Sequence, residues 1–141
     1  MIQFINENTQ IPVLQKRRLT RWIKSTAEEY GKITGDISYI FCSEEKILEI
    51  NRQYLNHDYF TDIITFDYSE KNILSGDIFI SPDTLKTNAI EFNVTFEEEL
   101  LRIIIHGILH LCGQDDKTPE SKRQMTVKED KALNAYKNMK S

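Results

Sequence analysis

The chain has 141 residues, of which 40% are hydrophobic and 28% charged, and its formal net charge is −4. This composition supports a hydrophobic core and predicts one soluble domain over residues 1–141, without disordered tracts or internal repeats. The negative charge argues against binding of nucleic acid over the whole surface, and no apolar stretch is long enough for a membrane span, so we expect a cytoplasmic protein with no membrane partner.

The first half of the chain alternates strand and helix patterns. Residues 2–5 are typical of a short strand. Apolar residues then recur at helical spacing from Pro12, whose fixed φ suits a first turn, up to a stop at Gly31. Residues 36–42 are rich in β-branched and aromatic side chains and predict a second strand. Ser43 is placed to cap a second helix.

The second half predicts a hairpin followed by three helices, with a polar turn between the two strands at Asn72 and Ser75–Gly76. The expected elements are a loop at 55–61, strands at 62–67 and 77–81, and helices at 82–91, 95–111 and 119–139. Residues 100–111 are apolar almost all round, which predicts a central, buried helix. The order β-α-β-α-β-β-α-α-α predicts an α+β fold, a mixed four-stranded sheet with packed helices.

The two cysteines and a group of cations have structural rather than functional interpretations. Cys42 and Cys112 do not form a CxxC pair, so we interpret them as reduced core thiols. Cys112 stands two residues after His110, and a helix points such neighbours in different directions. Cys112 is therefore a poor candidate for a metal ligand. Five cations gather in the first predicted helix, and we interpret them as a solvated face: Lys16, Arg17, Arg18, Arg21 and Lys24.

The predicted central helix carries His106 and His110, four residues apart, so their rings lie on one face. Two imidazoles at this spacing can share one divalent ion. Gly113 can end the helix in a left-handed conformation, and the turn can bring Asp115 or Asp116 back as a third ligand. Three protein ligands leave a position open, as in a catalytic zinc site. The alternative is a pair of hydrogen-bonded core histidines.

The spacing HxxxHxxGxxD resembles the metzincin metalloprotease pattern. That pattern has a glutamate directly after the first histidine, where it serves as the general base. Here the residue is Gly107, which has no side chain to take a proton. The peptidase interpretation therefore lacks its base.

Three stretches of the chain form recognisable motifs: HGILHLCGQDD at 106–116, GDIFIS at 76–81, and INRQYL at 50–55 with TDIITF at 61–66. They resemble, in that order, the motifs HGxLHLxGxDH, GDIxIS and LNxxYR…TDVLSF of the YbeY family of bacterial endoribonucleases. Two positions depart from the pattern: Asp116 replaces the third metal-binding histidine, and Leu55 replaces an arginine implicated in activity.

The resemblance implies a single-strand-specific, zinc-dependent endoribonuclease that acts in rRNA maturation and ribosome quality control. It implies one Zn²⁺ per chain on His106, His110 and Asp116, and partners that include ribosomal RNA and ribosomal particles or a ribosomal protein. Aspartate is an ordinary zinc ligand, although its charge makes the ion a weaker Lewis acid and makes other divalent metals acceptable.

Further candidates for the chemistry are Arg102 and His57. Arg102 lies four residues before His106 and is placed to face the cleft, or else to form an ion pair with Glu98 or Glu99. His57 belongs to a loop and is a candidate proton shuttle or phosphate contact. The resemblance places the strand that follows Thr61 and Asp62 beside the metal cleft, while the alternative is that these two residues only shape a turn.

Two other functions compete with the endoribonuclease. Leu55 and the acidic net charge fit a metal-stabilised binding factor in ribosome assembly that does not cut RNA. The histidine spacing alone fits another metal-dependent hydrolase, such as one acting on peptides, although Gly107 opposes it.

Overall fold

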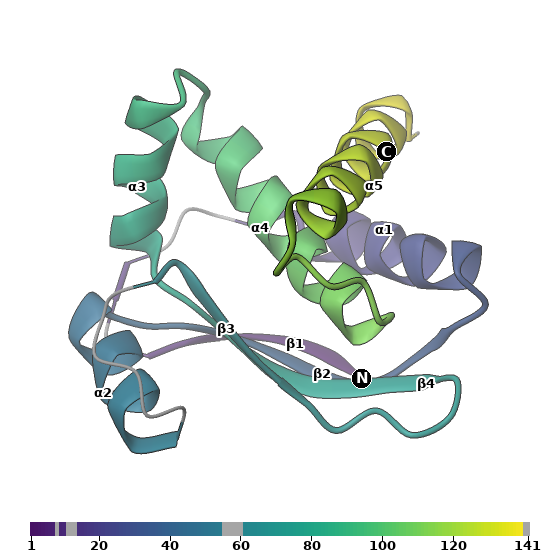
Figure 1. Cartoon of the computed structure of the whole chain (residues 1–141), viewed down its shortest axis with the longest axis horizontal. Coiled ribbons are helices and arrows are strands. Elements are labelled where there is room, and N and C mark those ends of the chain that lie inside the picture. The colour runs from purple at the N-terminus through teal and green to yellow at the C-terminus, as the bar shows by residue number, and fades with distance from the viewer. Residues whose placement is uncertain (8, 11–13, 55–60, 140–141) are drawn as a thin grey trace.

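A computed structural model describes residues 1–7, 9–10, 14–54 and 61–139. Four strands form one sheet, and helices cover both of its faces (Figure 1). The elements in chain order are β1 (Ile2–Asn6), α1 (Lys16–Glu29), β2 (Ile33–Phe41), α2 (Glu44–Tyr54), β3 (Ile63–Asp67), β4 (Ile73–Ile80), α3 (Pro82–Glu91), α4 (Phe96–Leu111) and α5 (Pro119–Asn138). The predicted order of elements and the α+β class are confirmed.

The sheet is mixed, with the strand order β1-β2-β4-β3. β1, β2 and β4 run parallel, while β3 pairs antiparallel with β4 as a hairpin. Parallel neighbours need long crossover connections, and α1 supplies the one between β1 and β2. The predicted hairpin is therefore correct, and β3 lies at the edge of the sheet.

The hairpin turn contains the predicted Asn72 but not the predicted Ser75–Gly76. The chain turns at Glu70–Ile73, and β4 already includes Ser75 and Gly76. Gly76 is a glycine for another reason: a Cβ there would lie 2.4 Å from the carbonyl oxygen of Phe66 on β3. The glycine thus permits a close approach of two strands, which the sequence pattern alone does not distinguish from a turn.

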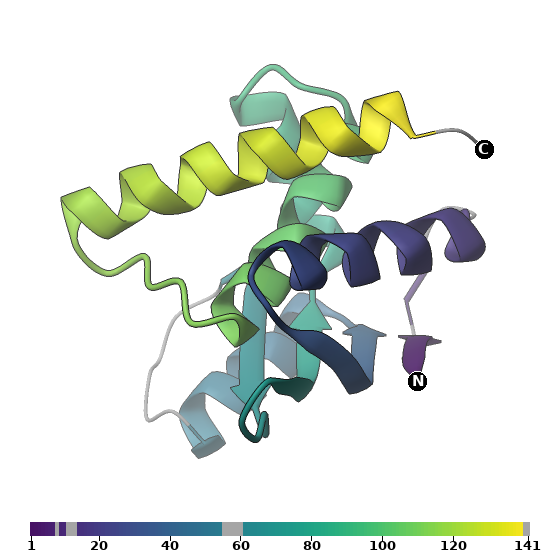
Figure 2. The same cartoon turned by 90° about the vertical axis from the view of Figure 1, so that its right-hand side faces the viewer.

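Helix α4 packs against β3 and β4, α1 packs against both α4 and β2, and α5 crosses the outer side of α4 (Figure 2). Ile104, Ile105 and Ile108 are fully buried, as the apolar pattern predicts. The hydroxyl of Tyr39 on β2 donates to the carbonyl of Ile104 at 2.9 Å. On the opposite face of the sheet, α2 packs Ile47 and other apolar residues in a smaller cluster. The central helix is thus held between the sheet and the helices α1, α3 and α5.

The ends of two elements also differ from the predictions. Helix α1 begins at Lys16, since Leu14 and Gln15 are not helical, and Pro12 lies outside the described residues. β2 begins at Ile33, before the predicted residue 36, because it continues alongside β4. The cap predicted at Thr95 is present, with its hydroxyl accepting from the Glu98 amide at 3.0 Å. None of the described helices is long and apolar enough to cross a bilayer.

Candidate metal centre

The last two turns of α4 and the loop that follows form the candidate centre. His106 and His110 project from one side of the helix, and Gly113, with φ +101°, reverses the chain. The carboxylate of Asp115 accepts from the amide of Asp116 at 2.7 Å and from that of Lys117 at 3.1 Å. Asp115 therefore shapes the turn, and Asp116 is the acid that faces the histidines.

Three possible ligand atoms converge at this place. Asp116 Oδ2 lies 3.3 Å from His106 Nε2 and 3.5 Å from His110 Nε2. The two rings are nearly perpendicular, at 87°, with centroids 4.5 Å apart. Ligands held about 2.0–2.1 Å from a tetrahedral ion lie roughly 3.3–3.4 Å from one another. The three residues therefore fit a small divalent cation, and among the described residues they are the group that could hold one.

The other nitrogen of each histidine is also engaged. His110 Nδ1 lies 2.9 Å from the carbonyl oxygen of Gln114, which can only accept, so Nδ1 donates. His106 Nδ1 lies 2.5 Å from Glu129 Oε2 on α5. With protons on both Nδ1 atoms, the lone pairs of both Nε2 atoms face Asp116. Contacts of this kind orient histidine ligands in metal sites.

The charges around the two histidines move their pKa values in opposite directions. Burial lowers the pKa of His106, but the hydrogen bond and charge of Glu129, together with the nearby Asp116 and Asp62, outweigh it, so this pKa lies above its usual value. Burial and the charge of His106 lower the pKa of His110. His110 is thus the imidazole that is more readily neutral.

Arg102 forms the ion pair with a carboxylate that was one of its two predicted roles. Its guanidinium donates to Glu129 Oε1 and to Asp130 Oδ1, both at 2.8 Å. The partners come from α5 rather than from the examples Glu98 and Glu99, because α5 packs against α4 at this point. Arg102 therefore reaches the centre through Glu129.

The sequence patterns did not single out Glu129, which is only 6% exposed. It stands on the buried side of α5 in line with Met125, Ala132 and Tyr136. A lone acid on the apolar stripe of an amphipathic helix is the signal that could have found it.

Asp62 lies just before β3, on the side of the centre formed by the sheet. Burial raises its pKa, while a backbone hydrogen bond and the charge of His106 act to lower it. Its carboxylate accepts from Asn88 of α3 at 3.3 Å and lies 3.5 Å from the Thr61 hydroxyl. This edge of the sheet therefore borders the centre. His57 and Leu55 lie outside the described residues.

Helix α4 approaches the sheet closely beside the first histidine. A Cβ at Gly107 would lie 3.0 Å from the nearest side-chain atom of Ile78 and 3.4 Å from Ile63. The glycine lets α4 rest directly on β3 and β4, which sets the height of the histidines above the sheet.

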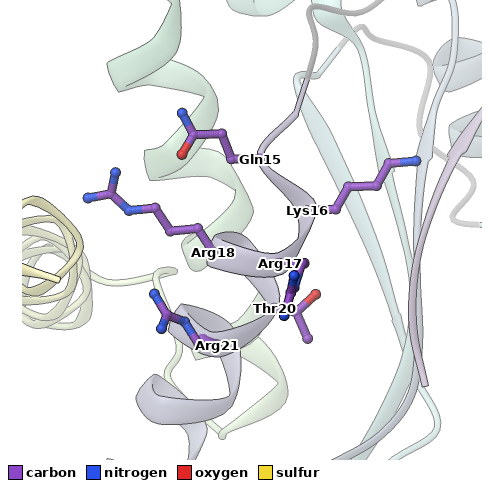
Figure 3. A pocket seen from close by; sticks show the side chains of 6 residues that line it. All are labelled: Gln15, Lys16, Arg17, Arg18, Thr20 and Arg21. Carbon is purple, nitrogen blue, oxygen red and sulfur yellow. The ribbon is translucent and has the colours of Figure 1, made fainter. Parts of the chain in front are cut away.

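The cations of α1 border an open hollow of about 920 Å³, separate from the metal centre (Figure 3). Arg18 packs against α5: it donates to the Tyr136 carbonyl at 2.6 Å, and its guanidinium lies 4.2 Å from the centre of that ring. Lys16, Arg17 and Arg21 are exposed, as a solvated face requires.

A family model described as Endoribonuclease YbeY matches residues 2–137. The chain belongs to the YbeY family. A relative from Parabacteroides distasonis is 60% identical over 94% of this chain and 93% of its own length, and one from Bacteroides fragilis is 59% identical over 94% and 95%. Both are named Endoribonuclease YbeY.

A solved structure of a protein from Thermotoga maritima, determined in solution, has the same fold. It is 29% identical to this chain, covers 97% of it and 92% of its own length, and superposes with a TM-score of 0.63. His106, His110 and Asp116 form a group that could hold a metal ion, so the structure is compatible with the predicted metal site at these residues.

Proposed function

We propose that this protein is a metal-dependent endoribonuclease that cleaves phosphodiester bonds in single-stranded RNA. One observation carries the proposal: Nε2 of His106, Nε2 of His110 and Oδ2 of Asp116 converge to 3.3 and 3.5 Å in a chain of the YbeY family. One Zn²⁺ per chain is the resident ion, since two imidazoles and a carboxylate are ordinary zinc ligands. Residues 1–141 act as one domain.

The residues of the chain divide the work around the ion. His106, His110 and Asp116 hold it and leave a coordination position toward solvent. A bound divalent ion supplies Lewis acidity to the reacting phosphate. Arg102 is held by Glu129 and Asp130, which favours an orienting role over direct contact with the phosphate. His57 is the candidate for that contact.

The substrate we propose is ribosomal RNA, cut during rRNA maturation and ribosome quality control in the cytoplasm. The resemblance of the three motifs to those of the YbeY family supports this choice. The net charge of −4 supports recognition through a ribosomal particle or a ribosomal protein rather than through a wholly basic surface.

The test incubates purified protein with a single-stranded and a structured rRNA fragment, beside a His110→Ala variant. Each reaction is run as purified, with a chelator, and with chelator followed by zinc or manganese. We expect cleavage of the single-stranded RNA by the wild type, loss with chelator and recovery with zinc. Equal cleavage by His110→Ala, or cleavage insensitive to chelator, would contradict the proposal.

A second candidate is a metal-stabilised ribosome-assembly factor that does not cleave RNA. Leu55 favours it, because leucine cannot hold a phosphate with two hydrogen bonds as the family's arginine can. The same preparations separate the two functions. A protein that holds one zinc ion, binds ribosomal particles and leaves RNA intact supports the assembly factor, and Leu55→Arg should then introduce cleavage.

A third function, hydrolysis of peptides, has only the histidine spacing in its favour. Gly107 occupies the position of the peptidase base and packs against Ile78. No turnover of generic peptide substrates by the zinc-loaded protein is expected.

A further inference from the structure

Glu129 is a buried carboxylate that the proposed chemistry does not use directly. It lies on α5, 6% exposed, with one oxygen facing Arg102 and the other facing His106. Burial of a carboxylate costs several kcal/mol unless charged partners and hydrogen bonds compensate it. Its position therefore calls for an explanation beyond the packing of α5.

The contacts form a chain that runs from the surface to the metal centre. Exposed Asp130 accepts from Arg102 Nη2 at 2.8 Å, and Glu129 Oε1 accepts from Arg102 Nη1 at 2.8 Å. Glu129 Oε2 then meets His106 Nδ1 at 2.5 Å. Arginine has donors only, so the oxygen that faces it must accept. The guanidinium thus fixes which oxygen of Glu129 is left for the histidine.

The second histidine needs no such residue. A backbone carbonyl, that of Gln114, holds the Nδ1 proton of His110 at 2.9 Å. His106 lies one turn earlier in the helix, where α4 faces α5 rather than the loop. There the side chain of Glu129 on α5 takes the place of the carbonyl.

We propose that Glu129 is a positioning residue that keeps the proton of His106 on Nδ1, so that Nε2 faces the ion. Arg102 and Asp130 orient Glu129 in turn. The proposal rests on the proposed metal site. It extends that site to α5 and makes the docking of the last helix part of the construction of the centre. A carboxylate behind the ring also makes the imidazole a stronger ligand.

Glu129→Gln gives the sharpest variant because it keeps the size of the side chain. In this variant Arg102 still requires an acceptor, so the amide oxygen turns toward Arg102 and the amide nitrogen faces His106. Two donors cannot meet, so the proton of His106 is expected to move to Nε2, the nitrogen that the ion needs. Asp130→Asn is the matched control. Asp130 lies next to Glu129 on α5 and also accepts from Arg102, but it does not contact His106.

The first measurement is made without metal. Nitrogen-15 chemical shifts of the histidine side chains report which ring nitrogen carries the proton, and the chain has three histidines to assign. The spectra are recorded at a pH where the His106 ring is neutral, because an imidazolium carries protons on both nitrogens. In the neutral ring we expect the proton on Nδ1 in the wild type and in Asp130→Asn, and on Nε2 in Glu129→Gln. An unchanged Nδ1 proton in Glu129→Gln would overturn the proposal, whether or not the protein cleaves RNA.

The second measurement is the affinity for zinc, from competition with a chromophoric chelator. Removing a contact of this kind typically weakens metal binding by about 10–100-fold, and we expect a loss in that range for Glu129→Gln. Asp130→Asn should stay within about threefold of the wild type, since its exposed contact is weak. Equal affinities for Glu129→Gln and the wild type would also overturn the proposal. Circular dichroism spectra establish that both variants are folded.

Discussion

Replacing Gly76 with alanine should destabilise the fold more than any other single methyl group added to the described glycines. The new Cβ would lie 2.4 Å from the carbonyl oxygen of Phe66 and 3.2 Å from a side-chain carbon of Leu111. The first neighbour is backbone of the adjacent strand and cannot rotate away. The second neighbour, Leu111, lies on α4 directly after His110, so β4 is confined by both β3 and α4.

The size of the effect follows from these distances. Atoms in van der Waals contact lie at about 3.4 Å or more, so β3 and β4 must separate by roughly 1 Å around the pair Asp67–Gly76. Overpacking costs about 1–3 kcal/mol, and a weakened pair of backbone hydrogen bonds about 1–3 kcal/mol more. The smaller entropy of the unfolded alanine chain offsets about 0.4–1 kcal/mol. We expect a net loss of about 1–5.5 kcal/mol.

The fluorescence of Trp22 during urea unfolding measures this loss of stability, because Trp22 is the only tryptophan and is 1% exposed. With a slope of about 2 kcal/mol/M, the midpoint should fall by roughly 0.5–2.8 M. Gly107→Ala is the control, since its neighbours are side-chain atoms at 3.0 Å or more and a helical alanine is favoured by about 1 kcal/mol. A Gly76→Ala midpoint equal to that of the control would refute the reasoning.

Three further predictions concern the centre and its surroundings. Zinc at about 100 times its Kd should add about 2.7 kcal/mol and raise the Tm by roughly 5–10 °C in calorimetry, whereas His110→Ala should show no rise. Asp116→His should retain this rise because imidazole also binds zinc, and Asp116→Ala should lose most of it; an equal rise in both would exclude Asp116 as a ligand. Burial, and then the charge of Asp62, raises the pKa of Glu99, so native protein binds more protons than unfolded protein between the usual and the raised value. Stability should therefore fall as pH rises through that range, and Glu99→Gln should be more stable at neutral pH; urea midpoints that follow the wild type at every pH would contradict this.

The features that the sequence predicted well are those encoded by near neighbours. Element order follows from apolar periodicity and from caps such as Thr95, which acts within four residues. The group of His106, His110 and Asp116 is also local, because one helical turn and one glycine-ended loop are enough to bring the three residues together. Such patterns carry their geometry with them.

The features that were missed depend on how distant elements cross. Glu129 follows His106 by 23 residues, and their contact exists only because α5 lies across α4. The same crossing gives Arg102 its partners. Gly76 was interpreted as part of a turn because glycine most often marks one, whereas here the neighbouring strand requires it. Pairing between elements, rather than any local pattern, decides such residues.

The contact between Gly107 and the sheet also limits what this protein can become in evolution. The HxxxH part of its metal site differs from the HExxH of peptidases in one residue, since Gly107 stands where the glutamate would be. The Cβ of a residue at this position would lie 3.0 Å from Ile78 and 3.4 Å from Ile63. The side chains of both isoleucines would therefore have to shift before a glutamate could be accommodated. The packing of α4 on the sheet thus disfavours the substitution that a peptidase base would need.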